Sequence, residues 1–412
     1  MEPKRFQKDV IINILASSIS TAVLNLIIYP AFARYYVSEE YGQILTALGI
    51  VNILFSSIGN TLNNIRLIYN KNNEEENRKG TYNLLITFLS VFGAVIGMTI
   101  ICRIFWISYF NAILLFFTIG IGILRAYYIV DYRLKLNYKK QLVSNIILSV
   151  GYLIGIFIGR KLIVWPLPFL LGETLSLIYT FHTSELIREP FRLTTFTINI
   201  IKAFILLMGC NILANVLVYL DRFVINPILG ASNVSVYNVA TFWGRCFGPF
   251  IAPISNVMLS YLSQKNSKID IARYKRLFLI TLCPIIVLCV LGFWGAPFLT
   301  GVLYPTLIQK SKEYIILSSI GVLLGYATSL ISPIIMTVCS MWELFIMNMI
   351  QFLIYGLITS LGAYKFHLFG FCAAVLIVNL LKVSIFYYWG YYKLTNIERG
   401  EEDETSIKDR NS

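Results

Sequence analysis

The sequence predicts an all-α, polytopic membrane protein with about twelve transmembrane helices arranged as two six-helix lobes. Three observations predict it: an apolar composition, a succession of apolar runs of roughly twenty residues, and a weak internal repeat. Of the 412 residues, 57% are hydrophobic and 13% are charged, and the mean hydropathy is +0.71. Soluble domains carry roughly 25% charged residues. A water-soluble fold of this length would therefore lack the polar side chains that its surface needs.

Apolar runs mark the predicted spans. A helix needs about 20 apolar residues to cross the hydrocarbon core of a bilayer. The first run, Val10 to Ala33, is longer than a signal-peptide core and lacks a small-residue cleavage site, so we expect a retained helix. The spans are predicted near residues 10–33, 43–66, 81–103, 108–130, 142–160, 163–184, 203–226, 236–262, 276–297, 314–338, 343–364 and 368–393.

The placement of basic residues predicts that both termini lie in the cytoplasm. Cytoplasmic segments of membrane proteins are enriched in lysine and arginine. With the N-terminus inside, the predicted inner segments hold most of the basic residues of this chain. This bias accounts for the net charge of +13, and a nucleic-acid partner is not needed to explain it. The predicted outer segments carry only Arg34, Arg103, Arg160, Lys161, Lys310, Lys312 and Lys365.

The cysteines and histidines indicate neither disulfides nor a metal site. The seven cysteines are an odd number, lie in or beside apolar segments, and form no CxxC motif. His182 and His367 lie near predicted helix ends without a partner motif. We therefore expect no metal and no bound cofactor, and we interpret the cysteines as small packing residues.

The two halves of the chain resemble each other around one turn. The first span ends in Tyr29-Pro30, and Tyr41 follows at the start of the second span. The seventh span ends in Asn226-Pro227, and Tyr237 follows at the start of the eighth. The matching residues lie about half the chain length apart, which predicts two parallel repeats with a transport site at their interface.

The repeat also predicts the domain boundaries. We expect an N-terminal six-helix lobe at residues 1–195 and a C-terminal six-helix lobe at residues 196–395. A cytoplasmic linker, Thr183 to Asn199, joins them. The charged segment 396–412 lacks aromatic residues, which predicts a disordered cytoplasmic tail.

Arg245 is the most informative charged residue, because it lies near the middle of the eighth predicted span. A guanidinium group stays charged in proteins, and at the bilayer centre it costs roughly 2.5–3.5 kcal/mol on insertion scales. Either an anionic cargo in a cavity or a buried ion pair must offset this cost, and we favour the cargo. Gly244, Gly248, Pro249 and Pro253 predict a bent helix around it.

Other charges lie within the predicted spans. Lys382, near the middle of the twelfth span, is expected to face a cavity or to contact a lipid phosphate. Glu173, in the sixth span, is a candidate for carrying a coupling proton or holding sodium, or it is a counter-charge for Arg245 or Lys382. Asp221 and Arg222 are adjacent and point about 100° apart on a helix, so each is expected to find its partner on another helix.

Two segments carry a resemblance to a known family. The segment Ala33 to Gly42 resembles the first outer turn of bacterial polysaccharide exporters. Leu220 to Gly230, continuing to Tyr237, resembles the matching turn of their second half. With the length and span count, the chain resembles the Wzx-type flippases of the multidrug/oligosaccharidyl-lipid/polysaccharide exporter superfamily.

The resemblance implies a V-shaped pair of lobes that works by alternating access in the bacterial cytoplasmic membrane. The implied cargo is an oligosaccharide repeat unit on undecaprenyl pyrophosphate, moved to the outer leaflet for O-antigen, capsule or exopolysaccharide synthesis. Membrane lipid and other polysaccharide-assembly proteins are the implied partners. The lipid II flippases of this superfamily depend on arginines in the cavity, one of them in the eighth span, and Arg245 occupies a comparable place.

The residues and the resemblance together give a candidate site without enzymatic chemistry. Arg245, Lys382, Arg66 and Arg222 are the candidates for substrate binding, and Arg66 meets the pyrophosphate or is an interfacial anchor. Glu173 and Asp221 are the candidates for coupling to Na⁺, H⁺ or the membrane potential. A multidrug efflux transporter of the same superfamily is the alternative. A membrane glycan polymerase is disfavoured, because the chain has no substantial outer loop for catalytic residues.

Overall fold

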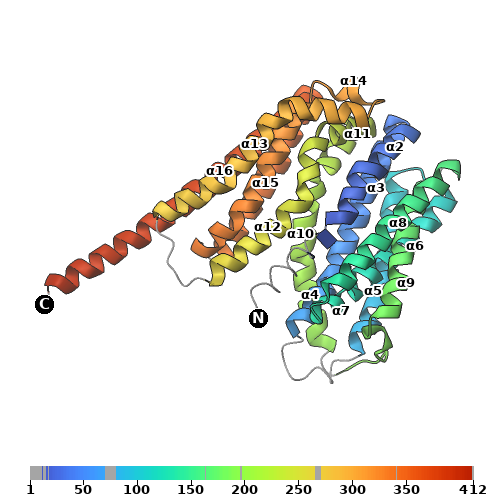
Figure 1. Ribbon diagram of the computed structural model, residues 1–412, viewed down its shortest axis with the longest axis horizontal. Coiled ribbons are helices and arrows are strands. Elements are labelled where there is room, and N and C mark those ends of the chain that lie inside the picture. Colours follow the sequence, from blue (N-terminus) through green and yellow to red (C-terminus); the bar gives the residue numbers. More distant parts are fainter. Residues whose placement is uncertain are drawn as a thin grey trace. The chain divides into compact units, whose positions relative to one another are not determined.

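The computed structural model describes residues 12, 15–16, 18–69, 80–162, 164–194, 197–264, 271–339 and 341–410 (Figure 1). Throughout these ranges the regular secondary structure is helical, and none of it is a strand. The chain divides into two compact units, Met1–Phe223 and Val224–Ser412, which we call unit 1 and unit 2. The predicted lobe boundary near residue 195 differs from this division, because the part of helix α10 (Thr197–Leu229) up to Phe223 packs with unit 1.

The helices confirm the predicted fold class. Seven of the described helical segments are long and apolar enough to cross a membrane, and a bent pair within α10 makes an eighth. Two helices at predicted spans are not among them. Helix α9 (Leu167–Thr183) has only 17 residues, and Arg245 and two prolines lower the hydropathy of α12 (Phe242–Gln264). The beginning of the first predicted span lies mostly outside the described residues.

Unit 1 begins with an irregular helix at a proline. Pro30 has no backbone N–H, and its ring crowds the carbonyl four residues earlier. The turn before it accordingly adopts a π-helical register. The elements of unit 1 before α10 are η1 (Leu24–Ile28), α2 (Tyr29–Tyr35), α3 (Ser38–Leu54), η2 (Phe55–Asn60), α4 (Thr61–Tyr69), α5 (Thr81–Ile104), α6 (Tyr109–Tyr128), α7 (Val130–Leu134), α8 (Tyr138–Leu162), α9 and η4 (Leu186–Arg188).

Small residues bring α8 and α9 together in unit 1. A Cβ atom on Gly151 would lie 2.5 Å from the Cα atom of Gly172, and one on Gly155 would collide with Pro168. A side chain at either glycine would force the two backbones apart. The pair therefore has the close approach that small residues spaced by four permit in membrane helices.

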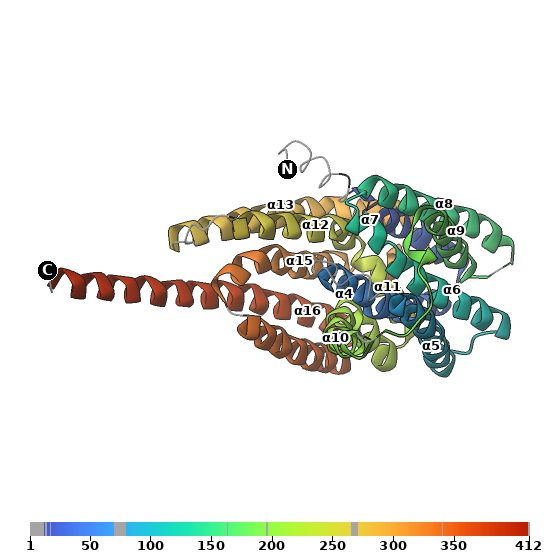
Figure 2. The same cartoon turned by 90° about the horizontal axis from the view of Figure 1, so that it is seen from below.

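Unit 2 contains the rest of α10 and five further helices. Helix α13 continues through Pro284 and Pro297, six residues beyond the predicted end of the ninth span. Helix α16 is interrupted by non-helical backbone at Phe366 and His367, so that its two parts fold back along each other (Figure 2). These five helices are α11 (Ala231–Ala240), α12, α13 (Ile271–Leu303), α14 (Ile308–Ser311), α15 (Ile315–Val338) and α16 (Met341–Arg410), the short α14 being a connector.

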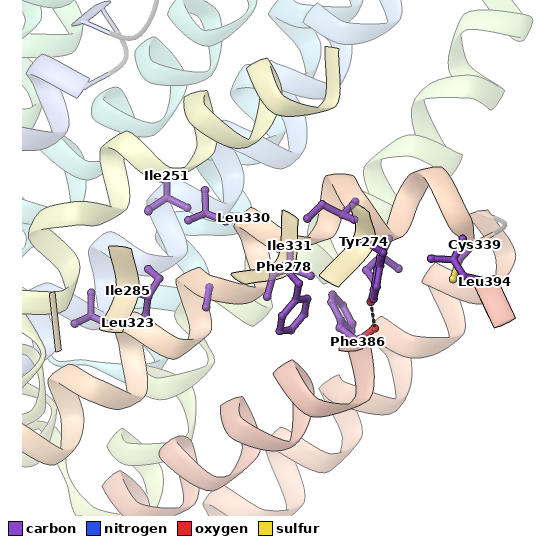
Figure 3. Close-up of a cluster of buried hydrophobic side chains, with 13 residues drawn as sticks. Ile251, Tyr274, Phe278, Ile285, Leu323, Leu330, Ile331, Cys339, Phe386 and Leu394 are labelled. Atoms are coloured by element: carbon purple, nitrogen blue, oxygen red, sulfur yellow. Dashed lines mark hydrogen bonds between the residues drawn. The ribbon is translucent and has the colours of Figure 1, made fainter. Parts of the chain in front are cut away.

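A cluster of buried apolar side chains joins α13, α15 and the second part of α16 (Figure 3). Tyr274 is completely buried in it, although it carries a polar hydroxyl. That hydroxyl donates to the backbone carbonyl oxygens of Phe386 and Tyr387, both at 3.1 Å. Because the polar atom is satisfied, the aromatic ring can stay in the core beside Phe278 and Ile331.

The end of the chain differs from the predicted disordered tail. Helix α16 continues to Arg410. No proline interrupts the sequence after Met341, and Glu404 and Lys408 stand at the i, i+4 spacing that stabilises helices. Residues 411–412 of the predicted tail lie outside the described residues.

Candidate functional site

Arg125 and Glu173 form a buried ion pair between α6 and α9 of unit 1. Arg125 donates from Nε to one carboxylate oxygen of Glu173 and from Nη2 to the other, the second at 3.2 Å. The hydroxyl of Tyr152 donates to the same carboxylate at 3.2 Å. Glu173 is only 1% exposed. The charges thus compensate each other inside the unit.

This pair corrects one of the sequence-based interpretations. Arg245 and Lys382 were proposed as counter-charges for Glu173, whereas the observed partner is Arg125. The sequence analysis had assigned Arg125 to an inner segment, although it lies within α6. A test for opposite charges at similar depth in predicted spans would have found it. The coupling role of Glu173 stays a prediction.

Arg66 fastens the linker to the end of α4. It donates to the two carboxylate oxygens of Glu189 at 3.0 and 2.5 Å and to the hydroxyl of Tyr127 at 2.7 Å. Its guanidinium also lies 4.9 Å from the ring centroid of Tyr82. Arg66 is 3% exposed, so an anionic cargo would have to displace Glu189 to reach it. Its role in binding cargo stays a prediction.

Arg222 joins α10 to α3 within unit 1. Its Nη1 donates to the backbone oxygen of Leu45, and its guanidinium lies 5.1 Å from the ring centroid of Tyr219. Both Asp221 and Arg222 are buried. The contact with Leu45 agrees with the expectation that Arg222 finds its partner on another helix. The transport roles of these two residues stay predictions.

Lys135, Asp131 and Glu185 form an ionic group where the linker begins. The Nζ of Lys135 lies 3.2 Å from Asp131 and 2.8 Å from Glu185. The hydrogen bond and the charge of Lys135 lower the pKa of the exposed Glu185 carboxyl. Desolvation acts to lower the pKa of Lys135, but the hydrogen bonds to both carboxylates outweigh it and raise that pKa. The linker is therefore held by charges at two places.

Arg245 lies in the first turn of α12 in unit 2 and is half-buried. Its Nε donates to the hydroxyl oxygen of Thr241 at 2.8 Å. Thr241 is buried at the junction of α11 and α12, so this bond orients the guanidinium relative to both helices. A Cβ atom on the preceding Gly244 would lie 2.9 Å from Val322, which shows how closely α12 packs on α15 there.

Lys382 lines a cavity of about 280 Å³ between the two parts of α16. Its Nζ lies 5.4 Å from the ring centroid of Phe386. Glu343, on the cavity wall, is ion-paired with Lys393 at 2.6 Å. Across the described ranges of the chain, no carboxylate forms an ion pair with Lys382. The other side chains of the wall are almost entirely apolar, among them Ile350 and Trp389.

No group of three or more His, Cys, Asp and Glu side chains that could hold a metal ion occurs among the residues with described positions.

Comparison with known proteins identifies the fold. Neither a protein-family model nor a curated protein matches the sequence. The lipid II flippase MurJ, in an inward closed conformation, is similar with a TM-score of 0.67 and 17% identity, over 92% of this chain and 88% of that one. An inward-facing multidrug resistance MATE family transporter of the MOP superfamily gives 0.62 and 12%, over 95% and 96%.

The MATE transporter VcmN of Vibrio cholerae is a third similar structure, with a TM-score of 0.60 or less and 13% identity over 94% of this chain and 96% of that one. Identities this low establish the fold alone. The chain is therefore a multi-pass, helical membrane protein with the fold shared by MATE transporters and the MurJ flippase, and these similar structures are transporters rather than enzymes.

Proposed function

We propose that this protein is a flippase for oligosaccharide repeat units linked to undecaprenyl pyrophosphate, and that it moves them to the outer leaflet of the bacterial cytoplasmic membrane. The observation that carries the proposal is the cationic character of the helices of unit 2. Arg245 is half-buried on α12, and Lys382 lines an apolar cavity on α16. A pyrophosphate is the part of a lipid-linked sugar that such charges recognise.

In the proposed mechanism, the pyrophosphate enters a cavity between two lobes from the cytoplasm. Arg245, oriented by Thr241, attracts it first, and Lys382 adds a second positive charge. The polyprenyl chain stays in the lipid throughout. The lobes then rock so that the site opens outward, which is the alternating access typical of transporters built from two repeats.

The membrane potential drives the proposed export. A head group with a charge of about −2 that moves outward through 100 mV, inside negative, gains roughly 4.6 kcal/mol. Glu173 is held by Arg125 and Tyr152, so coupling to Na⁺ or H⁺ through this carboxylate would require that ion pair to open. Asp221 is the second candidate for coupling.

A vesicle assay tests the proposal. The purified chain is reconstituted with a fluorescent disaccharide on undecaprenyl pyrophosphate, and an impermeant reductant reports how fast the label changes leaflet. Arg245→Ala and Lys382→Ala should each slow this exchange at least about tenfold, because each removes a charge-assisted contact worth roughly 1.5–3 kcal/mol. The exposed Arg276 of α13 provides the matched control, Arg276→Ala, which should keep the rate. Unchanged exchange in the Arg245 variant would overturn the proposed role.

Multidrug efflux is the alternative function, and the similarity to MATE transporters over almost the whole chain favours it. Cationic drugs call for an acidic cavity, whereas Arg245 and Lys382 make the described helices of unit 2 basic. Cells that express the chain are loaded with a cationic dye to separate the two functions. Energy-dependent dye efflux without lipid exchange in vesicles would favour the alternative.

A further inference from the structure

A pocket of about 180 Å³ lies at the end of unit 1 that is remote from Arg66. Three connecting turns meet there: the turn from α2 to α3, the turn from α5 to α6, and the turn from α8 to α9. Helix α3 and its continuation to α4 run from this pocket to Arg66, roughly 40 Å away at 1.5 Å per residue. A second pocket of about 250 Å³ adjoins the first and shares Tyr36 with it.

Aromatic rings form part of the pocket wall. Trp165 is buried, with 7% exposure, and its ring belongs to the turn before α9. Trp106 is fully exposed on the turn before α6. Tyr36 lies between the two pockets and is half-buried. An exposed ring beside a buried ring gives a ligand one fixed and one adjustable flat surface.

Planar polar side chains form the rest of the wall that matters here. Glu40, Gln43 and Asn111 line the same pocket. The Oδ1 atom of Asn111 is buried and has no hydrogen-bond partner within the described part of the chain. The backbone N–H of Asn111 donates to Ser108 at 3.3 Å, which fixes the start of α6. An unsatisfied buried acceptor in a pocket calls for a ligand or water that donates a hydrogen bond.

The phenol of Tyr36 completes this set as a donor. Burial and then the nearby charge of Glu40 raise the pKa of Tyr36 to about 12. Its hydroxyl therefore keeps its proton at neutral pH. The pocket thus offers carboxylate and amide acceptors, amide and phenol donors, and aromatic faces within one small volume.

We propose that this pocket binds a sugar ring. A hexopyranose has one face of C–H groups, which packs on aromatic rings, and a rim of hydroxyls, which both donate and accept hydrogen bonds. A lipid phosphate fits poorly, because Glu40 is negatively charged and neighbours Glu39. A quaternary ammonium group fits Glu40 and the rings, but it has no proton to donate to Asn111.

The place of the pocket in transport rests on the proposed function. The distribution of basic residues predicts that this end of unit 1 faces outward. A sugar that leaves the transport path there would be held by the pocket while its lipid anchor enters the outer leaflet. The proposal therefore names a receiving site for the sugar part of the cargo.

The experiment measures binding alone, so its failure is distinct from a failure of the proposed function. The purified full chain in lipid nanodiscs is mixed with lactose, maltose or N,N′-diacetylchitobiose, and saturation-transfer NMR records which sugar protons approach the protein. At least one sugar should bind with a Kd on the order of 1 mM, as expected for a small ligand with few contacts. The C–H face should receive the strongest transfer.

Two matched pairs of variants locate the binding. Trp106→Ala and Glu40→Gln should each weaken binding about tenfold. Tyr109→Ala and Glu39→Gln are their controls, because both residues are exposed, lie within three residues of their counterparts, and do not line the pocket. Binding of all three sugars too weak to detect at 20 mM would overturn the proposal, as would equal binding by Trp106→Ala and Tyr109→Ala. Stronger binding of choline than of any sugar, lost in Glu40→Gln, would assign the pocket to a cation instead.

Discussion

The two units of this protein treat their membrane charges differently. In unit 1, Arg66 and Arg125 each face a carboxylate, and every one of these charges is balanced inside the unit. In unit 2, Lys382 lies beside an aromatic ring in an apolar cavity, and Arg245 is oriented by a hydroxyl group. A charge that the fold itself neutralises locks helices together. A charge that it leaves exposed to a cavity is placed for a ligand, and the comparison separates structural from functional charges on that basis.

Removal of one partner from the Arg125–Glu173 pair is expected to have the largest effect. Arg125→Met leaves the carboxylate of Glu173 buried without a cation, which should cost about 3–5 kcal/mol. The loss should appear as a strong fall in the yield and melting temperature of the detergent-purified protein.

The double variant Arg125→Met/Glu173→Met provides the control, because it removes both charges together. Its melting temperature should recover most of the loss, since an apolar pair of similar volume often replaces a buried ion pair at little cost. If the single and double variants are equally unstable, the pair does not balance its charges as we describe.

The second prediction concerns the packing of unit 1 rather than its charges. Gly151→Ala places a methyl group 2.5 Å from the Cα atom of Gly172, where neither backbone can yield easily. We expect a loss of about 1–3 kcal/mol, as for other overpacked sites, measured by thermal denaturation. Gly209→Ala is the matched control, because a Cβ there meets no atom within 4 Å. Equal stability of the two variants would show that α8 and α9 can separate.

Much of the fold was predictable from the sequence, whereas the pairing of charges was not. Span length and hydropathy report on the bilayer, so the predicted ranges near 81–103 and 343–364 correspond to α5 and the first part of α16. Arg125 and Glu173 are far apart in the sequence, and their contact depends on how α6 packs against α9. The same holds for Glu189, which the sequence places in a polar linker and the structure places against Arg66.

The third prediction reverses the sign of the first. Lys382→Met removes a cation from an apolar cavity and leaves no carboxylate of the described chain without a partner. Because burying an isolated charge is unfavourable, this variant should be as stable as the original or more stable by up to about 1 kcal/mol. Thermal denaturation measures the effect. A loss as large as that of Arg125→Met would mean that Lys382 is structural, and the difference between the two units would disappear.

The smallest effect is expected at the linker, where the ionic group is exposed. The pKa of Glu185 is lowered by Lys135, so the contribution of this carboxylate is present above its ordinary pKa and is lost as the pH falls through the lowered value. The pKa of Lys135 is raised, so its contribution persists below its ordinary pKa and is lost only as the pH rises through the raised value. Glu185→Gln should therefore lower the melting temperature slightly at pH 7 and not at all below about pH 4. Salt should weaken the difference, because Glu185 is 77% exposed and its charge is screened. A difference that persists in 1 M salt would place Glu185 among the internally balanced charges of unit 1, beside Glu173 and Glu189.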